Sequence, residues 1–106
     1  MNKLAAYQHD WNPCTVEGYD QSNKEVTMIF NFDITTSSKT EAVIHYVVGR
    51  LIWGINNFPE NVKVRLSFDV RGQGIIISRS TALKNVILQY VNDLNITNAI
   101  EIEFFR

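Results

Sequence analysis

The sequence predicts an α/β (α+β) protein, a two-layer sandwich in which two helices cover one face of a mixed sheet of three to five strands. Three segments alternate apolar and polar residues with the period of two that is typical of a half-buried strand. Two other segments carry apolar residues at the helical period of about 3.6. Because the segments follow one another as strand, helix, strand, helix, strand, we expect the helices to cross over between strands of one sheet.

The first strand and the first helix are predicted between residues 25 and 58. In the range 25–34, apolar side chains fall on alternate positions, at Val26, Met28, Phe30, Phe32 and Ile34. Residues 35–38 are Thr and Ser, which cap helices, and Ser38 with Glu41 fits a capping box. A helical stripe follows, formed by Val43, Ile44, Val47, Val48, Leu51, Ile52 and Ile55, and Pro59 ends it.

The second half of the chain repeats this pattern. The range 62–70 alternates most regularly, and Gly72-Gln73-Gly74 reads as a turn or bulge. Residues 75–77 are too short to assign, and Ser80 or Thr81 is expected to cap the second helix. A final strand is expected over 100–104. The predicted core contains Val26, Phe30, Phe32, Leu66, Phe68, Ile87, Ile102 and Phe104.

Length and composition indicate one domain over residues 1–106, with an irregular segment over residues 1–24. The chain has 106 residues, of which 45% are hydrophobic. A single cysteine, Cys14, excludes an internal disulfide and a cysteine-based zinc site. No apolar run reaches the roughly 18–20 residues of a membrane span, and no signal-peptide core is found, so a cytoplasmic protein is expected. Ten Lys and Arg against eleven Asp and Glu argue against a general nucleic-acid binder.

Asp33 and Lys39 flank the junction between the first strand and the first helix. A carboxylate can hold a hard cation such as Mg²⁺, and a neighbouring lysine can stabilise charge on a phosphate. Asp20 and Glu25 are the upstream carboxylates that could complete such a metal site. The alternative reading is a helix-cap region with a solvated lysine.

Basic and polar side chains at and near the second strand are candidate substrate contacts. Lys63, Arg65 and Arg71 share the polar face, and Gln73 follows in the turn. Arginine forks suit bidentate recognition of phosphate, and strand ends are where ligands often sit in α/β folds. The alternative is a solvated sheet face, with a bulge that only ends strand pairing.

The range 64–73, followed by a helix and the strand at 100–104, resembles the C-terminal nuclease toxin domains of bacterial polymorphic toxins, including those of contact-dependent growth inhibition. Many of these domains have a restriction-endonuclease-like fold. Thr36-Ser37-Ser38-Lys39-Thr40 looks like their Ser-x-Lys-Thr stretch, whose lysine belongs to the active site. The resemblance covers about residues 33–106. Ser37 stands where such sites usually carry a metal-binding acid.

The resemblance implies a nuclease that cleaves tRNA or DNA in a toxin–immunity system, with a cognate immunity protein as partner. Lys39, Asp33 and Asp20 would then be catalytic, with Asp20 and Asp33 on a divalent cation. A small binding protein, either an immunity protein whose partner is a basic toxin or a phage-encoded inhibitor, is the rival interpretation. A third is an inactive relative that dimerises through a free strand edge.

Overall fold

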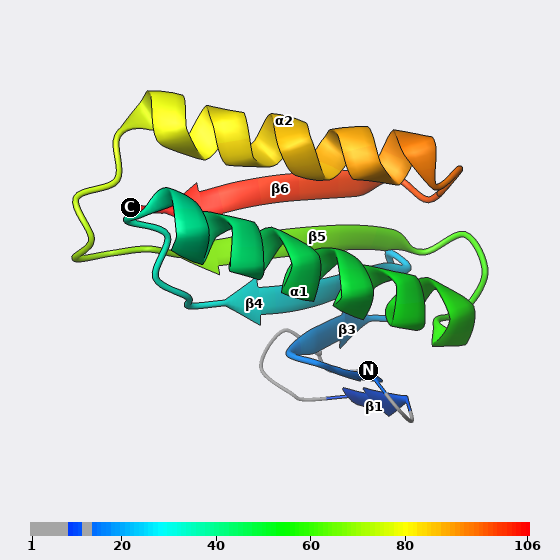
Figure 1. Cartoon of the computed structure of the whole chain (residues 1–106). Helices are drawn as coiled ribbons and strands as arrows, with labels where there is room; N and C mark the ends of the chain where they lie inside the picture. Colours follow the sequence, from blue (N-terminus) through cyan, green and yellow to red (C-terminus); the bar gives the residue numbers. More distant parts are fainter. Residues whose placement is uncertain (1–8, 12–13) are drawn as a thin grey trace.

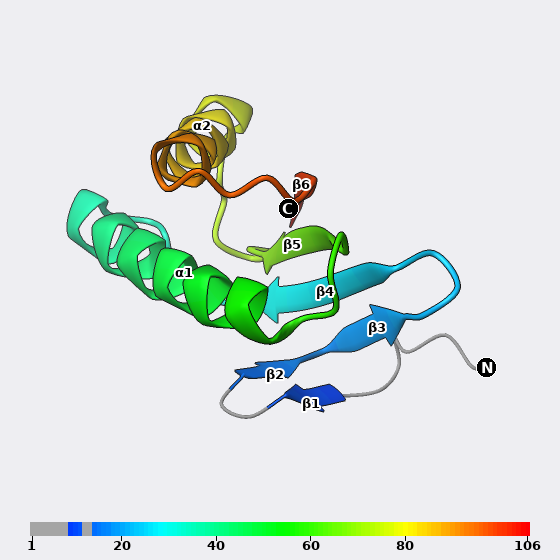
Figure 2. The same ribbon diagram turned by 90° about the vertical axis from the view of Figure 1, so that its right-hand side faces the viewer.

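Two helices pack on one face of a four-stranded mixed sheet, as the sequence predicts (Figures 1 and 2). The computed structural model describes residues 9–11 and 14–106. The strand order is β3-β4-β5-β6, where β3 spans Gly18–Asp20, β4 Glu25–Phe30, β5 Lys63–Asp69 and β6 Ile100–Phe105. β3 is antiparallel to β4, and β4, β5 and β6 are parallel.

The helices α1 (Ser37–Asn57) and α2 (Ile77–Asp93) connect the three parallel strands. Parallel strands need such crossovers, because a tight turn cannot return the chain to the same end of the sheet. Both helices therefore begin at the carboxyl end of the sheet, on the left of Figure 1. None of the helices in the described part of the chain has the length and apolar character needed to cross a membrane.

The segment before β3 is more regular than the sequence predicts. β1 (His9–Trp11) and β2 (Cys14–Val16) form a separate antiparallel pair, and β3 follows at once. The prediction that the whole of residues 1–24 is irregular is therefore wrong for these strands. Each contains only three residues, too few for the alternation that identifies a strand.

The core lies between the sheet and the helices. Phe68 is 1% exposed and stacks between Phe30 and Phe104, with ring centroids 5.4 and 5.1 Å away. The alternation predicted for β5 is confirmed, since Val64, Leu66 and Phe68 are buried. Of the predicted core, Val26, Phe30, Leu66, Phe68, Ile87 and Ile102 are buried, whereas Phe32 and Phe104 are partly buried.

Helix α1 begins at one of the predicted caps, whereas α2 begins earlier than the predicted Ser80 or Thr81. The N-cap of α1 is Thr36, whose hydroxyl accepts a hydrogen bond from the backbone nitrogen of Lys39 at 3.2 Å. The predicted Ser38–Glu41 capping box is therefore wrong. The N-cap of α2 is Ile76, which has no side-chain cap. Ile75, the residue before this cap, is buried, and the helix itself starts at Ile77. Sequence reasoning looks for a polar capping residue at such a start, and none is present here.

Candidate functional site at the carboxyl end of the sheet

The loops that follow β4 and β5 are joined by the side chain of Gln73. Its Nε2 donates to the carbonyl oxygen of Phe32 at 2.8 Å, and its Oε1 accepts from the nitrogen of Ile34 at 2.9 Å. Gly72 and Gly74 on either side have φ values of 85° and 69°, which side chains with a Cβ rarely adopt. The loop conformation therefore directs Gln73 across to the neighbouring loop, and the two strand ends become one site.

Asp33 and Lys39 form an ion pair in this site. The Lys39 Nζ lies 2.8 Å from the Asp33 Oδ2, and the backbone and hydroxyl of Thr35 donate to Oδ1 at 2.8 and 2.6 Å. The hydrogen bond from Lys39, followed by those from Thr35, holds the pKa of Asp33 well below its usual range. Asp33 is consequently ionised at neutral pH, and the predicted proximity of these two residues is present in the structure.

Asp69 and Arg71 form a second ion pair at the end of β5. The Arg71 Nη2 and Nε lie 2.7 and 2.9 Å from the two carboxylate oxygens. This bidentate contact with Arg71 lowers the pKa of Asp69 to about 2. We call Asp33, Lys39, Asp69 and Arg71 the strand-end cluster.

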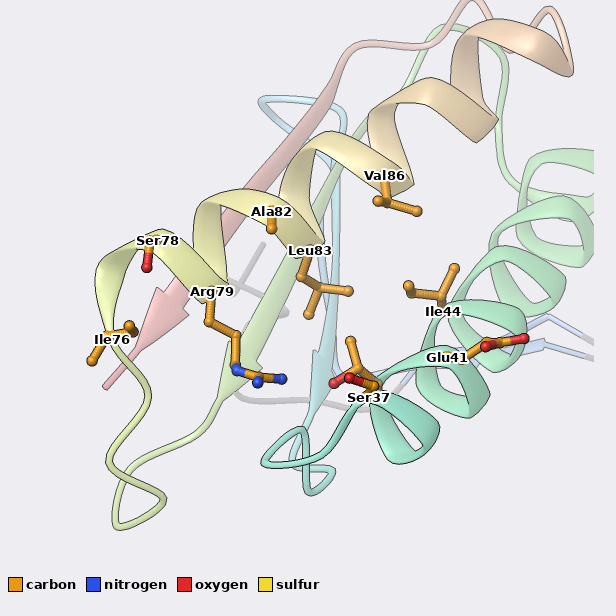
Figure 3. Close-up of a pocket in the computed structure, with 10 residues that line it drawn as sticks. Ser37, Glu41, Ile44, Ile76, Ser78, Arg79, Ala82, Leu83 and Val86 are labelled. Atoms are coloured by element: carbon orange, nitrogen blue, oxygen red, sulfur yellow. The ribbon is translucent and has the colours of Figure 1, made fainter.

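A groove between α1 and α2 opens beside this cluster (Figure 3). Its volume is about 510 Å³. Arg79 extends from α2 toward α1, and its Nη1 donates to the carbonyl oxygen of Ile34 at 3.2 Å. The other residues that line the groove come from the two helices and the N-cap of α2: Ser37, Thr40, Glu41, Ile44, Ile76, Ser78, Ala82, Leu83 and Val86. Sequence reasoning missed Arg79, because the second helix was expected to begin after it.

Asp20 lies far from this site. It pairs with Glu25 at the start of β4, whereas Asp33 follows the end of that strand. At about 3.3 Å per residue, the five steps of β4 from residue 25 to residue 30 alone span roughly 16 Å, and Asp33 lies three residues beyond them. Asp20 instead holds the turn after β3, where it accepts from Ser22 and Asn23.

The two ligands predicted for a divalent cation, Asp20 and Asp33, are therefore not brought together. Asp20 and Asp33 cannot bind one ion together, and Asp33 is held by Lys39. Across residues 9–11 and 14–106, no three His, Cys, Asp or Glu residues gather closely enough to hold a metal ion.

Lys63 and Arg65 lie on the open face of the sheet, the side that α1 and α2 do not cover, so the predicted polar register of β5 is confirmed. Both cations are paired with glutamates of the two neighbouring strands. Arg65 lies 3.0, 2.6 and 3.3 Å from Glu25, Glu101 and Glu103. Lys63 lies 3.6 and 3.1 Å from Glu25 and Glu101.

These five residues, Glu25, Lys63, Arg65, Glu101 and Glu103, form what we call the charge ladder. Ser67 joins it, donating to Glu103 at 2.6 Å. The structure therefore separates the four predicted substrate contacts. Arg71 and Gln73 belong to the strand-end site, whereas Lys63 and Arg65 belong to the charge ladder.

No protein-family model, curated protein or solved structure matches this chain. The nuclease toxin domain expected from the sequence rests on the motifs around Lys39 and Arg71. Both motifs lie at the carboxyl end of the sheet, joined by Gln73.

Proposed function

We propose that this protein is a nuclease domain of an interbacterial toxin–immunity system, and that it cleaves tRNA or DNA in the cytosol of a target bacterium. The observation that carries the proposal is the Gln73 contact, which joins the loop before α1 and Lys39 to the loop that contains Arg71 at one end of the sheet. These are the two motifs on which the resemblance to nuclease toxins depends. Segments about forty positions apart in the sequence thus meet at one end of the sheet.

Lys39 and Arg71 have the chemistry to bind phosphate. A lysine ammonium has three donors, and Asp33 accepts one of them; an arginine guanidinium has five, and Asp69 accepts two. Both side chains can therefore donate to a phosphate without leaving their carboxylates. A polynucleotide carries a phosphate at every nucleotide, and we propose that one strand contacts both cations.

Lys39 is the residue that we assign to catalysis. Its ammonium would stabilise the negative charge that grows on the phosphoryl oxygens in the transition state. Asp33 is a poor proton acceptor because its pKa is lowered, and its role is to position Lys39. Arg71 would hold a neighbouring phosphate, and Arg79 adds a positive charge at the mouth of the groove.

A second candidate function, a non-enzymatic immunity protein or phage-encoded inhibitor, is favoured by the charge ladder. Its three glutamates outnumber its two cations, and Glu101 remains 43% exposed. Such a face has an excess of negative charge with which to contact a basic toxin. A protein of this class needs a surface of this kind and no reacting groups.

One experiment separates the two functions. The purified protein is incubated with tRNA and with duplex DNA, with Mg²⁺ and with EDTA, while its expression is induced in bacteria without a partner. A nuclease cuts one substrate and arrests growth, and the EDTA arm reports whether a cation takes part. If neither substrate is cut in any arm and expression is harmless, the nuclease proposal is wrong.

A further inference from the structure

Strand β6 has one unpartnered edge in the described part of the chain. Its only neighbour there is β5. The nitrogens of Val64 in β5 and of Val70 directly after it donate to the carbonyl oxygens of Ala99 and Phe105 at 2.9 Å each. Backbone groups alternate in direction along a parallel strand. The N–H and C=O groups of Ile100, Ile102 and Phe104 therefore point away from β5, toward the unpartnered edge.

A hollow lies along this edge between β6 and α2. It has a volume of about 260 Å³ and is lined by Ser80, Thr81, Lys84, Ile102, Glu103, Phe104 and Arg106. An added strand would direct every second side chain into this hollow. Its lining has two cations, Lys84 and Arg106, against one carboxylate, Glu103, together with the hydroxyls of Ser80 and Thr81, so small hydroxyl side chains suit it better than basic ones.

On the open face of the sheet, the same edge favours basic side chains. Across the sheet, the acidic Glu25 of β4 is followed by the basic Lys63 and Arg65 of β5, and these by the acidic Glu101 and Glu103 of β6. Opposite charges on neighbouring strands stabilise a sheet, and like charges directly opposite destabilise it. The next strand in this order should therefore carry Lys or Arg at alternate positions.

Pairing of β6 with β6 of a second copy brings like charges together in its longest overlaps. In an antiparallel pair of β6 strands centred on Ile102, Glu101 of one copy would lie opposite Glu103 of the other. Registers centred on Glu101 or Glu103 place a glutamate opposite itself. The two registers that overlap most of β6 while keeping the apolar side chains on the helix side, centred on Ile102 and on Glu103, thus set like charges against each other.

We infer that the edge of β6 binds an extended segment of a partner protein in which Lys or Arg alternates with Ser or Thr. The segment adds a fifth strand to the sheet. Its backbone pairs with Ile100, Ile102 and Phe104, while its basic side chains lie beside Glu101 and Glu103. This binding is independent of phosphate chemistry at the strand-end cluster, so it holds for either proposed function.

The test uses the full chain and the acetylated, amidated heptapeptide Thr-Lys-Thr-Arg-Thr-Lys-Thr. Hydrogen exchange measured by NMR should slow at the amides of Ile100, Ile102 and Phe104 when this peptide is added. The same peptide with Glu at its three basic positions should leave them unchanged. Glu101→Gln should weaken binding about two- to five-fold, and Glu60→Gln, an exposed change in the loop before β5, should not.

Three results would overturn the inference. The first is unchanged exchange at the three amides at saturating peptide. The second is equal binding of the basic and acidic peptides, or of the Glu101→Gln variant and the unaltered chain. The third is a dimer in sedimentation experiments whose formation protects the same amides, which would make a second copy the occupant.

Discussion

The side-chain oxygen of Gln73 accepts a hydrogen bond from the backbone nitrogen of Ile34 at 2.9 Å, across 39 residues of sequence. The amide nitrogen of the same side chain donates to the carbonyl of Phe32. Gln73 thus replaces a backbone pairing that the two loops cannot make, because both strands have already ended. The strand-end cluster depends on this contact.

Replacing Gln73 with alanine should destabilise the protein. The change leaves a partly buried N–H and a partly buried carbonyl without their partner, which costs about 1–3 kcal/mol. Urea unfolding measures the difference. The matched control is Gln89→Ala on the surface of α2, where the lost bond to Asp93 is exposed and the cost should stay within about 0.5 kcal/mol. Equal effects of the two variants would contradict this role of Gln73.

The ion pair of Asp69 with Arg71 should be visible in a pH titration. The contact with Arg71 lowers the pKa of Asp69 to about 2, below the ordinary aspartate value of about 3.9. Because the folded pKa is the lower one, the stability due to this pair is present above about pH 4 and is lost as the pH falls toward 2. NMR titration of the carboxyl carbon should give this midpoint, and Arg71→Gln should move it upward. An unmoved midpoint would mean that Arg71 is not the cause.

Phe68 should be the most costly aromatic residue of the sheet to truncate. It is 1% exposed and stacks on two other rings, so Phe68→Ala leaves a cavity and should cost about 3–5 kcal/mol. Phe105→Ala, whose ring is 42% exposed, should cost far less. Thermal unfolding of the two variants provides the comparison. A Phe68→Ala protein that melts at the unaltered temperature would refute the assignment of β5.

Ser67 should stabilise the charge ladder through its hydrogen bond to Glu103. Its side chain is buried, and its hydroxyl donates to the Glu103 carboxylate at 2.6 Å. Hydrogen bonds to charged groups contribute about 1.5–3 kcal/mol, so Ser67→Ala should lower the free energy of unfolding by that amount. Ser22→Ala in the exposed turn after β3 is the control. Indistinguishable urea midpoints for the two variants would show that the Ser67 contact contributes nothing.

The sequence predicts the layered fold because strand and helix periodicities are strong over β4, α1, β5, α2 and β6. Its errors occur where the signal is short or unusual. β1 to β3 are too short to alternate visibly, and α2 begins after Ile76, a residue without a capping side chain. The predicted strand over 25–34 ends at Phe30, because residues 31–36 form the loop that carries Asp33.

The candidate site was predictable only in part. The pairing of Asp33 with Lys39 follows from six residues of separation across one loop, which local reasoning can reach. The bridge from Gln73 to Phe32 and Ile34 depends on two strands being neighbours with a particular register, which periodicity does not specify. The distance of Asp20 from Asp33 has the same origin, since the β3–β4 pairing sends the two residues to opposite ends.

The central claim is that Lys39 acts on a nucleic-acid phosphodiester, and cleavage by Lys39→Gln compared with Lys24→Asn tests it most directly. Each variant removes one exposed positive charge, and asparagine tolerates the positive φ of Lys24, which lies at the opposite end of the sheet. The account predicts that Lys39→Gln cleaves tRNA or DNA about 100- to 1,000-fold more slowly at an unchanged melting temperature, while Lys24→Asn keeps the original rate. Cleavage by Lys39→Gln at the original rate would contradict it.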